Sequence, residues 1–194
     1  MENLSVISVS EIVDWNVAKK CVRAGVRPCR KDTDNVVMEW RDLEIFFYIP
    51  IKDGIAYVSK ELAFDKWCVS YDDLYDTAVG NTAVASGIMS MANMLGMENM
   101  DDYIYVITNH EGFYGAGAIL CNDVLDNACR ILHTTHLCVI PSSIHELIVL
   151  DGAKLDMDEV AAMIQEINQA EVIERDRLGN HPYKYEKGKG FQEV

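Results

Sequence analysis

Leu43-Glu-Ile-Phe-Phe-Tyr-Ile-Pro-Ile51 and Ile55-Ala-Tyr-Val58, two runs rich in β-branched and aromatic residues, flank the triplet Lys52-Asp53-Gly54. Such runs favour strands, because branched and aromatic side chains pack well on a pleated surface. The Asp-Gly pair between them is typical of a tight hairpin turn. Tight turns join antiparallel strands, whereas parallel strands need long crossovers. The stretch 43–58 therefore predicts an antiparallel hairpin, and it decides the fold class.

The rest of the chain alternates between strand-like and helix-like segments. Further strands are expected at residues 36–39, 103–108, 118–121, 136–140, 145–150 and 183–185. Helices are expected at residues 12–22, 59–67, 70–82, 123–133 and 156–170. A turn at 111–117 is expected to join two of the strands into a second hairpin. We therefore predict an α+β fold, a single domain in which a mainly antiparallel sheet packs against helices.

The two ends of the chain differ in character from its middle. Residues 1–35 are expected to form a basic helix and a connection, residues 36–186 the α+β domain, and residues 187–194 a tail. Gly25 and Pro28 are expected to end the basic helix. Its basic residues are expected to form a solvated face, and they are Lys19, Lys20, Arg23 and Arg27.

The net charge of −14 is unevenly distributed along the sequence. Residues 36–170 hold six Lys and Arg against twenty-one Asp and Glu, while both ends are nearly neutral. An acidic body repels nucleic-acid phosphate, which argues against direct binding of DNA or RNA. It favours a basic protein partner or mimicry of nucleic acid, although charge that only keeps the protein in solution is the simpler interpretation. The candidate binding residues are Asp72, Asp73, Asp76, Asp101 and Asp102.

Neither a membrane span nor an export signal is expected. The longest apolar region, residues 83–97, is interrupted by polar residues and glycine. The N-terminal stretch lacks the basic start of a secretory signal, so we expect a cytoplasmic protein. Cysteines 21, 29, 68, 121, 129 and 138 are therefore expected to be reduced, mostly as small buried apolar residues. Methionines 89, 91, 94 and 97 are either gap-filling core, which we favour, or a plastic binding surface.

The segment Ser142-Ser143-Ile144-His145-Glu146 brings together a hydroxyl, a base and an acid. In an extended segment residues two apart share a face, which would place Ser143 beside His145. Nucleophilic catalysis also needs a third, orienting group and an oxyanion hole, and Glu146 faces away from His145. The competing interpretation, which we favour, is a turn whose serines make local hydrogen bonds to the backbone.

Three weaker patterns each have a structural interpretation. Cys129, His133, His136 and Cys138 are residue types that bind zinc, but their spacing matches no standard motif, and buried thiols are favoured. Gly112-x-x-Gly115-x-Gly117 reverses the order of a dinucleotide-binding loop, and the hairpin turn is favoured. His110-Glu111 is expected to be a solvated loop. No metal or cofactor is expected.

Several short patterns occur in an order that resembles a known family. They are Trp67-x-x-Ser70-x-x-x-Leu74-x-x-x-Ala78-x-x-Asn81-Thr82, Tyr105-Val-Ile-Thr-Asn109, Gly115-Ala116, Ile140-Pro-Ser-Ser-Ile-His-Glu146, Met163-Ile-x-Glu166-Ile-Asn168, and the pair Tyr183 and Tyr185. Together they resemble the bacterial domain-of-unknown-function family 5688. The resemblance implies a setting in Firmicutes, near mobile elements or phage-like regions, without an established enzymatic role. It also implies that Ser142, Ser143, His145 and Glu146 are the place for a site.

Three functions follow from these observations. The first, which we favour, is a non-enzymatic acidic binding protein, for example an inhibitor or nucleic-acid mimic acting on a basic nucleic-acid-handling protein. The alternative is a small hydrolase or metal-dependent enzyme centred on Ser143, His145 and Glu146. The third is a homo-oligomerisation domain that uses the methionine-rich segment.

Overall fold

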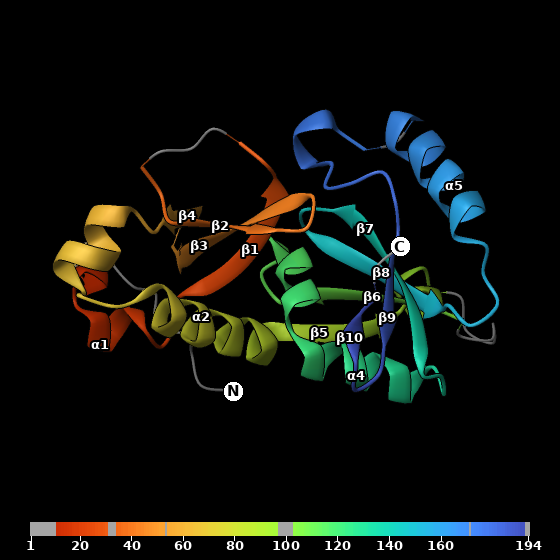
Figure 1. Cartoon of the computed structure of the whole chain (residues 1–194), viewed down its shortest axis with the longest axis horizontal. Coiled ribbons are helices and arrows are strands. Elements are labelled where there is room, and N and C mark those ends of the chain that lie inside the picture. The colour runs from red at the N-terminus through yellow and green to blue at the C-terminus, as the bar shows by residue number, and fades with distance from the viewer. Residues whose placement is uncertain (1–10, 31–33, 53, 97–102, 171, 193–194) are drawn as a thin grey trace. The chain divides into compact units, whose positions relative to one another are not determined.

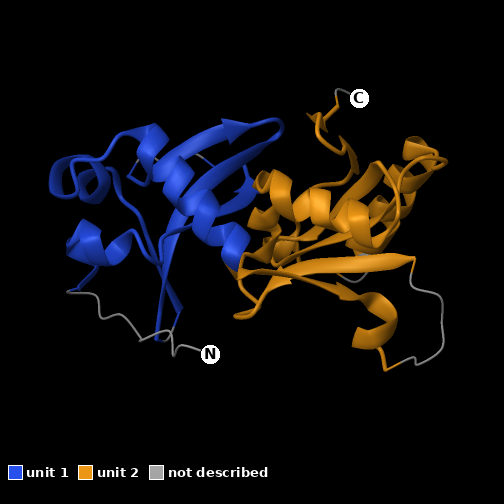
Figure 2. Cartoon of the chain, turned by 90° about the horizontal axis from the view of Figure 1, so that it is seen from below, with its two compact units in different colours: residues 1–84 blue, residues 85–194 orange. Residues whose placement is uncertain are grey.

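The computed structural model describes residues 11–30, 34–52, 54–96, 103–170 and 172–192. Contacts within the chain group it into two units, residues 1–84 and residues 85–194 (Figure 2). Each unit is built around an antiparallel sheet of its own.

The predicted hairpin forms the framework of the sheet in the first unit. Strand β3 (Leu43–Ile51) pairs with β1 (Arg23–Pro28) along one edge and with β2 (Val37–Trp40) and β4 (Gly54–Tyr57) along the other. All three pairings are antiparallel, and β3 is buried over most of its length. The helical segments are η1 (Glu11–Val13), α1 (Trp15–Ala18), the π-helical turn η2 (Glu61–Lys66) and α2 (Tyr71–Ala85) (Figure 1).

Residues 23–28 form strand β1, where the sequence predicted the end of a basic helix. Gly25 lies under the ring of Phe46, whose Cζ would be 2.5 Å from an added Cβ. The Nε of Arg27 donates to Glu44 Oε1 over 2.7 Å, and both side chains are buried. The expected solvated face is therefore wrong for Arg23 and Arg27, because pairing with β3 and the buried carboxylate override the local helical pattern.

Helix α2 is bound at its start and near its end by side chains that the sequence singles out. Ser70 Oγ accepts from the Asp73 amide and donates to the Asp73 carboxylate, which confirms the predicted start. Asn81 Nδ2 donates to the carbonyls of Lys19 and Val22 over 3.0 and 2.8 Å. Thr82 Oγ1 accepts from the Ala24 amide over 3.0 Å. These side chains of α2 therefore make hydrogen bonds with backbone groups in β1 and just before it, and β1 lies at an edge of its sheet.

The second unit contains a six-stranded antiparallel sheet with the order β10-β9-β7-β8-β6-β5. The strands are β5 (Ser86–Ser90), β6 (Ile104–Asn109), β7 (His136–Ser143), β8 (Glu146–Asp151), β9 (Tyr183–Glu186) and β10 (Gly190–Phe191). The helices are α3 (Met91–Met94), η3 (Gly115–Leu120), α4 (Asn122–Ile131), α5 (Met157–Ala170) and η4 (Glu174–Asp176).

Helices α4 and α5 cover opposite faces of this sheet (Figure 1). Tyr185, which is paired with Leu137, donates its hydroxyl to Asp126 Oδ1 on α4 over 2.7 Å. Cys138 packs in one cluster with α5. Leu137 and Cys138 are neighbours in β7, and successive strand residues point to opposite faces. The core of the unit is therefore two layers of side chains, one on each face of the sheet.

Two predicted segments of this unit take other forms. Residues 115–120 are a buried 3-10 helix and not a hairpin strand, and Gly115 packs so closely on the His145 carbonyl oxygen that a Cβ would not fit. Residues 84–97 supply β5 and α3, and Met89 and Met94 are 45 % and 49 % exposed, so the core interpretation is wrong for these two. Met97, and Asp53 of the first hairpin turn, lie outside the described residues.

The α+β class and the antiparallel strand pairing are confirmed. The strands are divided between two sheets, whereas the sequence predicted one sheet. The ends of the chain also contribute: β1 lies within residues 1–35, and β10 lies within the expected tail. Pairings of this kind join distant segments, and local periodicity does not reveal them.

Candidate functional site

Ile144 and His145 form the turn between β7 and β8, and Ser143 and Glu146 flank it. Pro141, Ser142 and Ser143 were expected to form this turn and are instead the last residues of β7, but the expected local hydrogen bond of a serine is present. Ser143 Oγ accepts a hydrogen bond from the His145 amide over 3.1 Å. The strand register shifts between Ile140 and Ser143, beside the buried Pro141. Proline has no amide to donate to the ladder, so a bulge is where it is tolerated. The serine hydroxyl is therefore used to shape the turn.

The imidazole of His145 is directed to two other segments. Its Nδ1 accepts from the Tyr114 amide over 3.3 Å, and its Nε2 lies 3.7 Å from Asp176 Oδ1. The neutral ring therefore carries its proton on Nε2, facing the carboxylate. About a third of the His145 side chain is exposed, at 32 %. The rings of Phe113 and Tyr114 lie 6.0 and 5.9 Å from it, centroid to centroid.

The loop that reaches His145 is held by its own contacts. The Asn109 side chain donates to the Phe113 carbonyl over 2.6 Å and accepts from the Phe113 amide over 3.3 Å. Tyr114 has a φ of 55°, a left-handed conformation that is uncommon for tyrosine. A Cβ at Gly115 would meet the carbonyl oxygen of His145, which is why a glycine is required there. The Thr108 hydroxyl donates to that same carbonyl over 2.9 Å.

These contacts define what Ser143, His145 and Glu146 can do chemically. The turn presents an imidazole–carboxylate pair, His145 and Asp176, and the Ser143 hydroxyl takes part in a different hydrogen bond. Glu146 is the first residue of β8 and pairs with Ser143 in the strand register. Asp176 was not predicted, because only the fold brings η4 to this turn, where the Ile144 amide donates to the Asp176 carbonyl over 2.9 Å.

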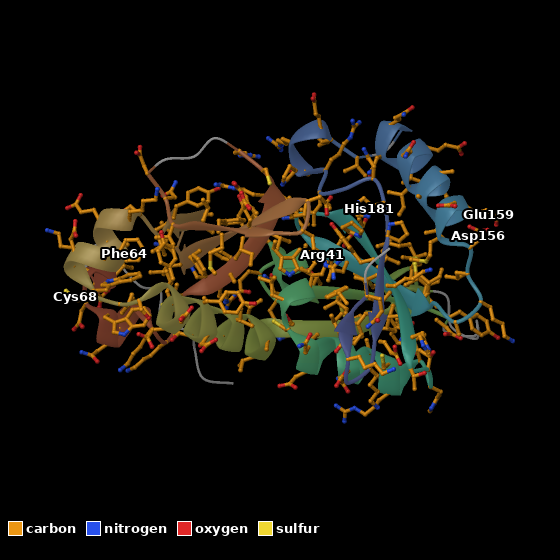
Figure 3. All side chains as sticks on the ribbon, viewed as in Figure 1. Arg41, Phe64, Cys68, Asp156, Glu159 and His181 are labelled. Atoms are coloured by element: carbon orange, nitrogen blue, oxygen red, sulfur yellow. The ribbon has the colours of Figure 1, made fainter. Side chains whose placement is uncertain are left out.

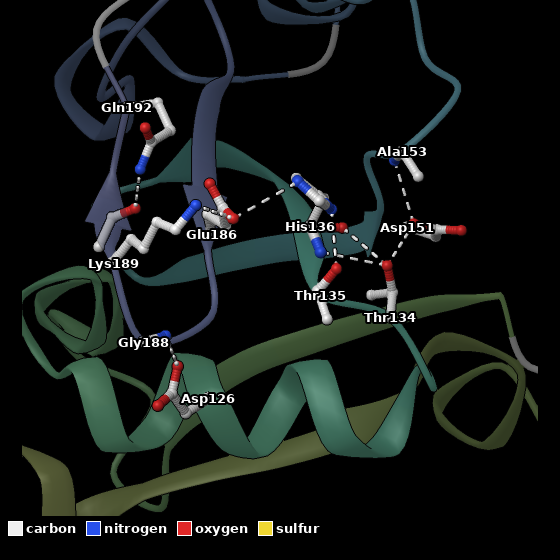
Figure 4. A network of polar contacts seen from close by, with 11 residues as sticks. Asp126, Thr134, Thr135, His136, Asp151, Ala153, Glu186, Gly188, Lys189 and Gln192 are labelled. Carbon is white, nitrogen blue, oxygen red and sulfur yellow. Dashed lines mark hydrogen bonds and ion pairs between the residues drawn. The ribbon is translucent and has the colours of Figure 1, made fainter.

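The cysteines and histidines of the zinc hypothesis do not converge. Cys129 and Cys138 are buried, and burial raises the pKa of each thiol to about 11. His136 lies 2.9 Å from Thr135 Oγ1 and 3.9 Å from Glu186 Oε1 (Figure 4). Among the residues that the structure describes, no group of three or more His, Cys, Asp or Glu has an arrangement that could hold a metal ion.

The glycine pattern does not form a phosphate-binding loop. Gly112 has a φ of +69° in an exposed turn, while Gly115 and Gly117 are buried in η3. His110 and Glu111 are exposed loop residues, as predicted.

The candidate acids of the first unit are exposed at the start of α2. Asp73 is part of the capping box with Ser70, so its carboxylate already has a structural role. Asp72 and Asp76 lie one helical turn apart on the surface. Asp101 and Asp102 lie outside the described residues.

The second unit carries most of the negative charge. It holds seventeen Asp and Glu against seven Lys and Arg, a net charge of −10, whereas the first unit holds fourteen against ten. Helix α5 contributes strongly: Asp158, Glu159 and Glu166 are exposed, and the helix contains no basic residue. Asp156 Oδ1 accepts from the Asp158 amide over 2.9 Å and caps this helix. Figure 3 shows Asp156 and Glu159 at its start.

Comparison with known protein families gives a match for this chain. Residues 33–187 match the model of the family of unknown function DUF5688. The chain belongs to this family. Most of both sheets of this DUF5688 protein falls within the matched residues, as does the turn at Ser143–Glu146. Searches of curated proteins and of solved structures found no match. None of the helices in the described part of the chain is long and apolar enough to cross a bilayer.

Proposed function

We propose that this DUF5688 protein is a non-enzymatic binding protein that docks through an acidic surface on a basic protein partner. The observation that carries the proposal is the charge of the second unit. Its residues 85–170 hold twelve acids and two bases, and those of α5 are exposed. Charge concentrated in this way accelerates association with an oppositely charged surface and makes binding depend on salt.

The hydrogen bonding of the β7–β8 turn also supports a binding role. The Ser143 hydroxyl accepts the His145 amide, and the His145 ring accepts the Tyr114 amide. Each of these side chains thus takes the place of a backbone carbonyl as the acceptor for an amide. Amides in a buried or half-buried turn need such acceptors for the turn to be stable. The exposed carboxylates of α5 have no comparable task in shaping the fold, apart from favouring its N-terminal end.

The partner that we propose is a nucleic-acid-handling protein of a bacterial or mobile-element setting. Proteins that bind DNA or RNA carry basic grooves lined with Lys and Arg, which offer an extended surface complementary to carboxylates. Occupying such a groove would block the nucleic acid, so the chain would act as an inhibitor by mimicry.

Affinity capture tests this proposal. The full chain is immobilised and exposed to a bacterial lysate at low salt, and bound proteins are eluted at about 0.5 M salt, where surface charges are strongly screened. A column carrying the D158N/E159Q/E166Q variant is the control. We expect a basic protein on the first column only, and we expect the chain to displace DNA from it. An empty column, or a captured protein whose DNA binding is unaffected, would contradict the proposal.

The alternative proposal is a small hydrolase or metal-dependent enzyme centred on Ser143, His145 and Glu146. The partly exposed pair of His145 and Asp176 favours it, because a carboxylate that faces an imidazole can orient a general base. Ester and phosphoester substrates, with and without zinc or magnesium, would be screened against the wild type and H145A. Turnover that disappears in H145A would support the enzyme and displace the binding proposal.

A further inference from the structure

Helix α5 has an inner face that is fully used by the fold. Met157, Val160 and Ile164 are buried, each less than a tenth exposed. They pack with Cys138 and Ile140 of β7 in one cluster. Residues at this spacing occupy one side of a helix, and burying them anchors α5 on the sheet.

Beside that inner face runs an apolar row that the fold leaves half exposed. Met163 and Ile167 lie one helical turn apart, and they are 48 % and 49 % exposed. By helical spacing both lie on the same side of the helix as Val160 and Ile164. The structure shows that the buried face is narrower, so two large apolar side chains remain at the surface.

Two carboxylates border this row on its solvent side. Glu159 precedes Met163 by one turn, and Glu166 lies between Met163 and Ile167 on the adjacent row of the helix. Both glutamates are exposed. We name the set Glu159, Met163, Glu166 and Ile167 the α5 stripe.

We infer that the α5 stripe receives a basic, amphipathic helix of the partner protein, an inference that rests on the proposed function and specifies its surface. Two apolar side chains one turn apart match the anchors with which an amphipathic helix binds an apolar surface. Methionine suits such a surface, because its unbranched side chain adapts to different partners. The bordering glutamates select Lys and Arg beside those anchors.

The same charges argue against other occupants. A second copy docked through the same face would bring the glutamates of both molecules together, because symmetric dimers use one patch twice. The anionic leaflet of a membrane would repel them. A neutral or acidic helix would leave the carboxylates without partners at the rim. A helix with an apolar face flanked by Lys and Arg would pack on Met163 and Ile167 and place its basic side chains beside the two glutamates of the α5 stripe.

A designed peptide tests the inference with the full chain. The probe is a fluorescent helix of Leu and Lys with one apolar face, and a scrambled peptide of the same composition lacks that face. Anisotropy at low salt is expected to show that the helix binds and that the scrambled peptide binds at least about tenfold more weakly. The M163S/I167S variant is expected to bind the helix about tenfold more weakly. The matched control is V84S, since Val84 is 88 % exposed on another helix.

Charge variants distinguish an error in the choice of the α5 stripe from an error in the proposed acidic binding role. E159Q/E166Q is expected to lose about fivefold in affinity at low salt and to show a shallower dependence on salt, whereas D72N/D76N is expected to behave as wild type. If D72N/D76N loses affinity and both α5 variants bind normally, the α5 stripe is the wrong surface and the acidic binding role stands. If the wild type binds no basic peptide at any salt concentration, the proposed function fails too. Circular dichroism establishes that each variant is folded.

Discussion

The β7–β8 turn and the α5 stripe belong to the same unit and differ in how the fold uses their side chains. The turn contains the residue types associated with catalysis, yet its serine and histidine bind backbone amides. The α5 stripe contains ordinary Met, Ile and Glu, yet its apolar side chains are half exposed. Residue type alone is therefore a poor guide to function, because a side chain that already makes a structural hydrogen bond is less available for chemistry or binding.

The largest expected effect is the difference in stability between a substitution on the inner face of α5 and one in the α5 stripe. Ile164 is 4 % exposed, so I164A should lower the free energy of unfolding by about 3 kcal/mol through lost burial and a cavity. I167A, at a half-exposed position, should lower the free energy of unfolding by less than about 0.5 kcal/mol. Urea unfolding measures both. Equal losses would mean that Ile167 is core, which would remove the basis for the α5 stripe.

A second prediction concerns the glycine that lets the loop approach the turn. G115A should cost about 2 kcal/mol, because the added methyl group would press on the His145 carbonyl and on Thr108. G87A is the matched control, since the nearest atom to its Cβ would be the Thr108 carbonyl oxygen at 3.9 Å. Urea unfolding should show little change in G87A. A G115A protein as stable as wild type would show that the loop and turn are not closely packed.

A third prediction addresses the role of His145 itself. H145A leaves the Tyr114 amide without its acceptor and should lower the free energy of unfolding by about 1 kcal/mol. H110A, at an exposed loop position, should change it by less than about 0.5 kcal/mol. Thermal or urea unfolding at neutral pH distinguishes them. If H145A is as stable as the wild type, the hydrogen bond of His145 does not stabilise the fold, and the histidine becomes a candidate for a catalytic role again.

The smallest effect is a pH dependence beneath α5. Burial raises the pKa of the Cys138 thiol to about 11, above the value of about 8.5 in an unfolded chain. Its contribution to stability is therefore complete below about pH 8.5 and is lost as pH rises towards 11, with under about 1 kcal/mol lost by pH 9. Stability of C138A should fall less steeply between pH 8 and 10 than that of wild type.

The α5 stripe variant M163S/I167S provides the control for this titration and should follow the wild-type curve, because neither Met163 nor Ile167 belongs to the buried cluster that contains Cys138. Parallel curves for C138A and wild type would mean that water reaches Cys138 and that the inner face of α5 is loosely docked.

Sequence patterns predicted the elements that depend on local signals. Residues 43–51 form the expected strand, and the helix predicted after Asp156 begins at Met157 with Asp156 as its cap. The meaning of Gly25 and Arg27 depends instead on Phe46 and Glu44 of the paired strand, so a helix was predicted where a strand forms.

The candidate site was predictable to a similar extent. The serines of the turn favoured local hydrogen bonds, and Ser143 makes one. Asp176, the acid that faces His145, is distant along the chain and could not be selected from the other acids. The exposure of Met163 and Ile167 was missed because helical periodicity shows which residues share a side and not how wide the covered side is.

Methyl NMR of the full chain shows directly whether a basic helix binds at Met163 and Ile167. The methionine and isoleucine methyl groups are labelled with ¹³C, and spectra are recorded as the Leu/Lys helix is added at low salt. We expect that the signals of Met163 and Ile167 shift most, those of the buried Met157 and Ile164 shift less, and those of Met89, Met94 and Ile104 stay in place. Shifts confined to these last three residues, beside the edge strand β5, would contradict the account and move the binding surface away from α5.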